Sequence, residues 1–97
     1  MSDLRILTTG ETDDVWLTTT ANVDLSTAEV SVRTFPTSSD PTGSWVSPQD
    51  VEHPTANSLR TALRVTNATP GAYVMQAKIT LGPLTIIESG YYWVADL

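Results

Sequence analysis

The chain has 97 residues, with five Lys and Arg against eleven Asp and Glu, and its net charge at neutral pH is −6. This length predicts one domain, and the acidic balance excludes nucleic acid as an expected partner, because phosphate backbones are bound by clustered Lys and Arg. Cysteine is absent, so neither disulfides nor thiolate metal sites can hold the fold together.

Along the chain, apolar and polar residues alternate with a period of two, and no window keeps the 3.6-residue period of a helix. This pattern indicates half-buried β-strands. Gly82 and Pro83 separate the last two strands and predict a tight hairpin, while Gly90 predicts a bulge or bend in the final one. The expected strands cover residues 3–7, 14–20, 28–35, 59–66, 73–81 and 84–94.

In each longer strand the apolar residues share one face. In residues 14–20, Val15 and Leu17 lie on one side and Trp16 on the other. One packed face and one wet face are typical of antiparallel sheets. The sequence therefore predicts an all-β fold, an immunoglobulin-like antiparallel β-sandwich of six to eight short strands. It forms a single domain over residues 1–97 without a disulfide.

Residues 36–57 break this alternation and hold four of the six prolines. Proline fixes φ and lacks an amide donor, so this segment cannot form a central strand, and we expect a long Pro-rich loop within the domain. Its apolar residues Trp45 and Val46 are unusual for a solvated linker. Trp45 either caps the open end of the sandwich or docks on a partner.

The tripeptide at residues 67–69, Asn-Ala-Thr, matches the acceptor pattern for N-glycosylation. It also precedes a turn at Pro70 and Gly71, after which Tyr73 opens a strand on its inward face. In β-sandwiches a tyrosine at such a corner is buried, and its hydroxyl bonds back to the preceding loop. We therefore expect Pro70, Gly71 and Tyr73 to form a structural corner, with an unmodified Asn67.

Both faces of the closing strand are apolar. Tyr91 and Trp93 share one face with Ile87, and Tyr92 and Val94 occupy the other. Either one set fills the core while the long loop covers the other, or Tyr91 and Trp93 belong to a protein–protein interface, where aromatic anchors dominate.

No group of residues has the spacing of an active site. His53 is the only histidine, and one His without Cys can supply neither a zinc ligand set nor an evident catalytic dyad. An acidic cluster offers oxygen ligands for calcium, but its spacing matches no calcium loop, and carboxylates at turns usually cap backbone amides. The sequence predicts no enzyme activity, cofactor or metal, with a bound cation as the alternative for this cluster. Its members are Glu11, Asp13, Asp14 and Asp24.

Residues 13–33 and 70–94 resemble small immunoglobulin-like virion proteins of bacteriophages. They are similar to the N-terminal domain of phage baseplate upper proteins and to minor capsid or decoration proteins of actinobacteriophages. The loop at residues 36–57 is not part of that pattern, and no C-terminal extension is visible, which suits a free-standing decoration protein. The matching residues are Asp14, Val15, Leu17, Val23, Asp24, Leu25, Ser26, Ala28, Val30, Pro70, Gly71 and Tyr73.

The resemblance implies a non-enzymatic structural protein of the virion, foremost a capsid decoration or minor capsid protein. Many copies would bind the assembled lattice of the major capsid protein and stabilise it, with homo-oligomers on the lattice as a further expectation. Contacts with the major capsid protein or other virion proteins are expected at Trp45, Val46, Tyr91 and Trp93.

Two alternatives remain open. The protein could instead belong to the head-to-tail connector, tail or baseplate, or it could be a carbohydrate or host-surface binding module that uses Trp16 and Trp45. Neither a signal peptide nor an apolar run of ~20 residues is visible. We therefore expect synthesis in a cytoplasm and no membrane partner, and the resemblance implies that this is the cytoplasm of a bacterial host and that the protein resides in the virion.

Overall fold

The computed structural model describes residues 5–96, which form seven β-strands. No helix occurs in this part of the chain, and hence none that could span a membrane. Two residues of the expected first strand, 3 and 4, lie outside the described residues. The strands are β1 (Arg5–Thr8), β2 (Thr12–Thr20), β3 (Glu29–Pro36), β4 (Asp50–Thr55), β5 (Ser58–Thr66), β6 (Gly71–Leu81) and β7 (Leu84–Ala95).

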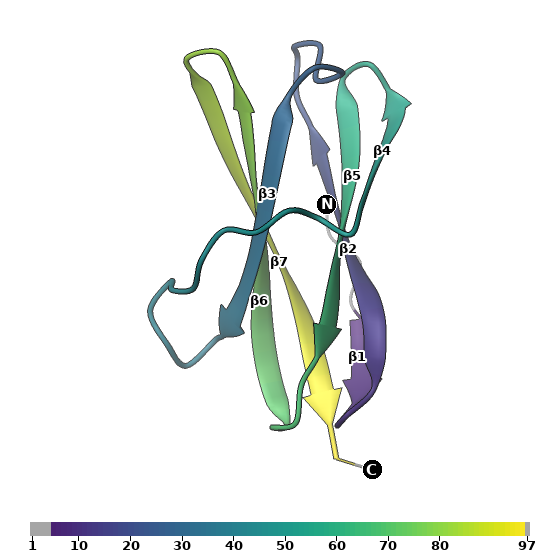
Figure 1. Cartoon of the computed structure of the whole chain (residues 1–97), viewed down its shortest axis with the longest axis vertical. Helices are drawn as coiled ribbons and strands as arrows, with labels where there is room; N and C mark the ends of the chain where they lie inside the picture. Colours follow the sequence, from purple (N-terminus) through teal and green to yellow (C-terminus); the bar gives the residue numbers. More distant parts are fainter. Residues whose placement is uncertain (1–4, 97) are drawn as a thin grey trace.

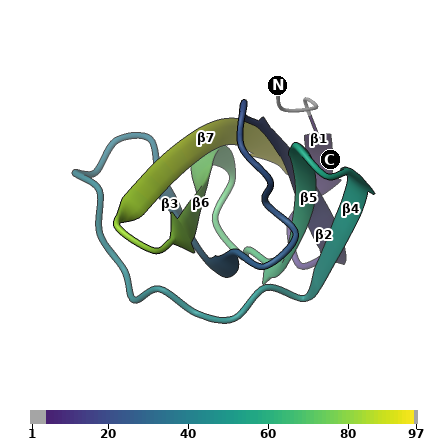
Figure 2. The ribbon, with the colours of Figure 1, turned by 90° about the horizontal axis from the view of Figure 1, so that it is seen from above.

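The strands form two sheets, one in the order β1-β7-β6-β3 and one in the order β2-β5-β4. Every neighbouring pair is antiparallel except β1 and β7, which run parallel. The sheets pack face to face over one core, so the predicted all-β sandwich is confirmed (Figures 1 and 2).

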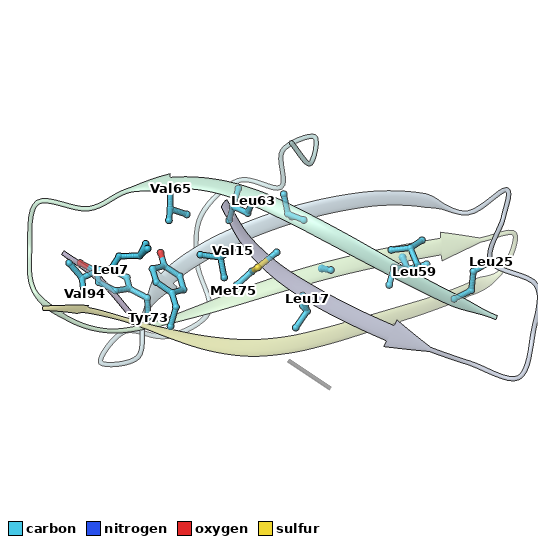
Figure 3. Close-up of a cluster of buried hydrophobic side chains, with 14 residues drawn as sticks. Leu7, Val15, Leu17, Leu25, Leu59, Leu63, Val65, Tyr73, Met75 and Val94 are labelled. Carbon is cyan, nitrogen blue, oxygen red and sulfur yellow. The ribbon is translucent and has the colours of Figure 1, made fainter. Parts of the chain in front are cut away.

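The core runs along the whole sandwich, from Leu7 and Val94 at one end to Leu25 and Leu59 at the other (Figure 3). The inward sets predicted from alternation supply it, because successive side chains of a strand point to opposite faces. β6 alone contributes Tyr73, Met75, Ala77 and Ile79. On β2, Val15 and Leu17 are buried as expected, while the Trp16 ring lies outward under the guanidinium of Arg60.

The prediction of a loop over all of residues 36–57 is wrong for its last part, because β4 occupies Asp50–Thr55. This strand is an edge of the three-stranded sheet, and its register against β5 shifts between Glu52 and Thr55. Pro54 falls in that shift, where its missing N–H removes no bond from the ladder. The irregular connection between β3 and β4 passes outside the sandwich from one sheet to the other (Figures 1 and 2).

The β6–β7 hairpin has the tight turn expected from Gly82 and Pro83, with Leu81 paired to Leu84. The φ of Gly82 is 58°, and a positive φ followed by proline suits a two-residue hairpin turn with Gly in the first position. The bulge expected at Gly90 is wrong. Gly90 pairs with Met75 in an unbroken register that continues over the whole hairpin.

Tyr73 and Tyr92 form a stacked pair in the core at the end of the sandwich where β1 lies. Their ring centroids are 5.3 Å apart with an interplanar angle of 13°. The Tyr73 hydroxyl donates to the carbonyl of Thr69 at 2.7 Å, and Gly71 takes a φ of 143° beside it. This is the corner arrangement expected from Pro70, Gly71 and Tyr73.

Tyr92 is fully buried, yet its hydroxyl has partners. Its Oη lies 2.8 Å from Thr34 Oγ1 and donates to Asn67 Oδ1 at 3.2 Å. The backbone carbonyl of Asn67 accepts from Gly10, so the first residue of the glycosylation tripeptide holds structural contacts on both its side chain and its backbone. Burial raises the pKa of the Tyr92 hydroxyl above its ordinary value.

Two buried hydroxyls lack partners. Thr19 and Thr61 lie on the inward faces of β2 and β5, and neither Oγ1 has a hydrogen-bond partner among the described residues. A hydroxyl that loses water on folding and gains no bond costs free energy.

Replacing Thr61 by valine should therefore stabilise the protein, since it keeps the side-chain shape and removes the unpaired hydroxyl. We expect the free energy of unfolding to rise by about 1 kcal/mol in urea denaturation. Thr85→Val, the same change at an exposed site on β7, should shift stability by less than about 0.5 kcal/mol. A less stable Thr61→Val variant would show that the hydroxyl has a bonding role.

The Tyr92 hydroxyl should also make stability depend on alkaline pH. A pKa raised in the folded state means that the folded chain holds this proton more tightly than the unfolded chain does. The protonated hydroxyl therefore contributes its full share of the folding stability below the unfolded pKa of about 10, and this share is lost as pH rises through the folded pKa. Tyr92→Phe should lose about 1–2 kcal/mol at neutral pH through its missing hydrogen bonds.

The stability gap between the wild type and Tyr92→Phe should then narrow above about pH 10. Denaturant titrations across that range measure it, with the exposed Tyr91→Phe as the matched control. A gap that stays constant into strong alkali would mean that Tyr92 titrates normally.

Candidate functional site

The outer face of the four-stranded sheet carries a contiguous exposed apolar patch. Ile6, Tyr91 and Trp93 are 63%, 55% and 49% exposed. Ile6 and Trp93 are register partners on β1 and β7, and Tyr91 is the next outward residue of β7. We call these three residues the aromatic patch.

The aromatic patch exists because β7 has apolar residues on both faces. Tyr92 and Val94 point into the core and are buried, which leaves Tyr91 and Trp93 outward. The long loop does not cover them, so the alternative in which it does is wrong. Ile87, further along the same face, is also exposed.

Trp45 and Val46 lie at the opposite edge of the same sheet. Val46 exchanges two backbone hydrogen bonds with Val32, which fixes the β3–β4 connection along the edge of β3. The Trp45 ring lies over Arg33, 4.2 Å from its guanidinium carbon, and over Lys78, 4.8 Å from its Nζ. Trp45 therefore covers the outer face of β3 and β6 and does not cap an open end between the sheets.

A polar row crosses the sheet between these two features. Arg33 Nε donates to Gln76 Oε1 at 2.9 Å, and Gln76 Nε2 donates to Ser89 Oγ at 3.2 Å. These three residues face one another on β3, β6 and β7. The aromatic patch therefore lies on one side of the row, with Val74 and Phe35 opposite Tyr91 across the strands.

The four residues expected as partner contacts thus belong to one sheet, with Tyr91 and Trp93 on β7 and Trp45 and Val46 beside β3. Sequence reasoning missed Ile6, Arg33 and Lys78. Alternation alone places each of them outward, but only the strand order β1-β7-β6-β3 shows that they share a face.

The expected acidic cluster is dispersed into separate local roles. Asp14 accepts from Arg64 at 2.9 Å, and Asp13 pairs with Arg5. Glu11 accepts from the backbone N–H of Thr8, and hydrogen bonds from Ser26 lower the pKa of Asp24. Among the described residues no group of three or more His, Cys, Asp and Glu could hold a metal ion.

His53 lies exposed on β4, the edge strand of the other sheet. The outer face of that sheet carries ion pairs instead of an apolar patch. Arg60 binds Glu52 at 2.7 Å, and Arg64 binds Asp14. Its one aromatic ring, Trp16, is half covered and lies 4.5 Å from the guanidinium carbon of Arg60.

Comparisons with family models, curated proteins and solved structures gave no match for this chain. The resemblance to phage virion proteins therefore depends on the motif residues alone. Several of these residues have clear structural roles: Leu25 is fully buried, Asp24 accepts from the Ser26 N–H, and Tyr73 forms the corner.

Proposed function

We propose that this protein is a non-enzymatic structural module that docks on other proteins through the outer face of its four-stranded sheet. The observation that supports this most is the aromatic patch, in which Ile6, Tyr91 and Trp93 stay about half exposed side by side. Contiguous apolar surface on a small soluble domain marks an interaction site, and Trp and Tyr are the residues that most often anchor one.

We also infer that the sandwich is of the immunoglobulin type. Its sheets match that arrangement, with β2-β5-β4 in the places of strands B, E and D, and β7-β6-β3 in the places of G, F and C. The hydrogen bond from Tyr73 to Thr69 corresponds to the tyrosine corner at the start of strand F. This assignment supports the resemblance to immunoglobulin-like virion proteins.

Within a virion, the role that suits these features best is capsid decoration. Each copy would bury its aromatic patch against the major capsid protein, and binding to the assembled shell alone would stabilise that shell by mass action. Many weak contacts on one lattice add up to a large total. A connector, tail or baseplate position would use the same surface at a lower copy number.

The carbohydrate-binding alternative has less support from the geometry. Trp16 and Trp45, the two residues considered for it, each have a guanidinium over the indole ring, where a sugar would have to stack. The guanidinium carbon of Arg60 lies 4.5 Å from the Trp16 centroid, and that of Arg33 lies 4.2 Å from the Trp45 centroid. One face of each indole is thus already in use. The exposed aromatic residues are Tyr91 and Trp93.

Removing the aromatic patch should abolish docking without unfolding the protein. We expect Tyr91→Ser combined with Trp93→Ser to weaken binding to phage particles depleted of this protein by about 100-fold or more, since two central anchors each contribute about 2 kcal/mol or more. Cosedimentation of purified protein with those particles measures this loss.

Leu84→Ser is the matched control, because Leu84 is an exposed apolar residue at the hairpin, away from the patch. It should bind as the wild type does. Unchanged binding by the double variant would overturn the docking face, and densitometry that finds six or twelve copies per particle would replace decoration by a connector or tail role.

A further inference from the structure

The outer face of the four-stranded sheet holds two cations that lack carboxylate partners. Arg5, Arg60 and Arg64 each pair with an Asp or Glu. Arg33 and Lys78 form no ion pair within the described part of the chain, although the protein has eleven acidic residues. Both of these cations lie under the Trp45 ring.

Arg33 is held in one orientation by three groups. Its guanidinium lies over the rings of both Trp45 and Phe35, with its central carbon 4.2 Å and 5.5 Å from their centroids. Its Nε donates to Gln76, which is itself held by Ser89. This leaves the two Nη groups of Arg33 and the Nζ of Lys78 without a hydrogen-bond acceptor among the described residues, so their N–H groups remain available as donors.

Two like charges beside one ring repel each other, and an anion placed between them would relieve that repulsion. A fixed guanidinium suits a carboxylate, because its paired N–H groups match the two oxygens. The nature of the anion follows from the rest of the chain. The net charge is −6, and within residues 5–96 Arg33 and Lys78 are the Lys and Arg side chains without an ion pair. The protein would therefore repel a polyanion such as a nucleic acid or an anionic lipid surface.

Resting on the proposed function, we propose that Arg33, Lys78 and Trp45 form a carboxylate-binding site that takes an Asp or Glu side chain of the docked partner protein. The aromatic patch receives apolar side chains of the same partner across the row of Gln76 and Ser89. The partner surface is thus an acidic residue flanked by apolar ones. The cation pair fixes how the partner is oriented, and the aromatic patch supplies most of the buried apolar area.

This site can be tested without any phage particle. Two capped peptides, acetyl-Leu-Glu-Leu-amide and the neutral acetyl-Leu-Gln-Leu-amide, are titrated into ¹⁵N-labelled protein, with inorganic phosphate as a third titrant. We expect the Glu peptide to shift the Nε–H signal of Arg33, the indole N–H of Trp45 and amides of β3 and β6, and to bind about tenfold more tightly than the Gln peptide.

Lys78→Gln and Arg33→Gln should each remove that preference for the Glu peptide. Arg64→Gln changes charge equally on the opposite sheet and should retain it. Lys78→Gln leaves the contacts of Arg33 with Gln76 and Phe35 intact, so it tests the site even where Arg33→Gln disturbs the sheet. Equal binding of the two peptides, shifts centred on Arg60 and Arg64, or phosphate binding as tight as that of the Glu peptide would each overturn the proposal.

The outcome also separates this inference from the docking face itself. If Lys78→Gln binds depleted particles as the wild type does while Tyr91→Ser with Trp93→Ser does not, the docking face stands and the carboxylate site is overturned. If the Glu peptide binds more tightly than the Gln peptide, but neither Lys78→Gln nor Tyr91→Ser with Trp93→Ser affects particle binding, the carboxylate site stands and the virion role fails.

Discussion

The stacked pair of Tyr73 and Tyr92 is the contact on which this end of the sandwich depends. The two rings join β6 to β7 inside the core, and their hydroxyls reach Thr69, Thr34 and Asn67. In a chain without cysteine, this buried hydrogen-bonded aromatic pair supplies the local cross-linking that a disulfide provides in other small sandwiches. It also commits Tyr92 and Val94 of β7 to the core, which sends Tyr91 and Trp93 to the outside.

The two sheets consequently have outer faces of opposite character. On the three-stranded sheet, Arg60 and Arg64 meet their own carboxylates across the strands, so that face satisfies its charges internally. On the four-stranded sheet, the partners of Arg33 and Lys78 among residues 5–96 are aromatic rings and a neutral amide, next to exposed apolar side chains. Both unpaired charge and exposed apolar surface therefore concentrate on one side of the molecule, which is the side proposed to dock on a partner.

Much of the fold could be predicted from the sequence, because period-two alternation indicates which residues of a strand share a face. The buried set of β6 and the outward position of Trp16 followed from this alternation, and the hairpin followed from Gly82 and Pro83 between two alternating segments. β4 could not be read in this way, because Pro54 and exposed polar residues on an edge strand leave no alternating signal. The contact of Trp45 with Arg33 and Lys78 could not be predicted from the sequence either, since it depends on strand order and on the backbone bridge between Val32 and Val46.

The parallel pairing of β1 with β7 has a consequence for the timing of assembly. Ile6 and Trp93 come from opposite ends of the described chain, and they become neighbours only when the first strand is laid along the last. Pairing at such sequence separation is slow, because a long loop must close before any contact forms. A nascent chain on the ribosome therefore cannot assemble the proposed docking surface until β7 has emerged and paired with β1.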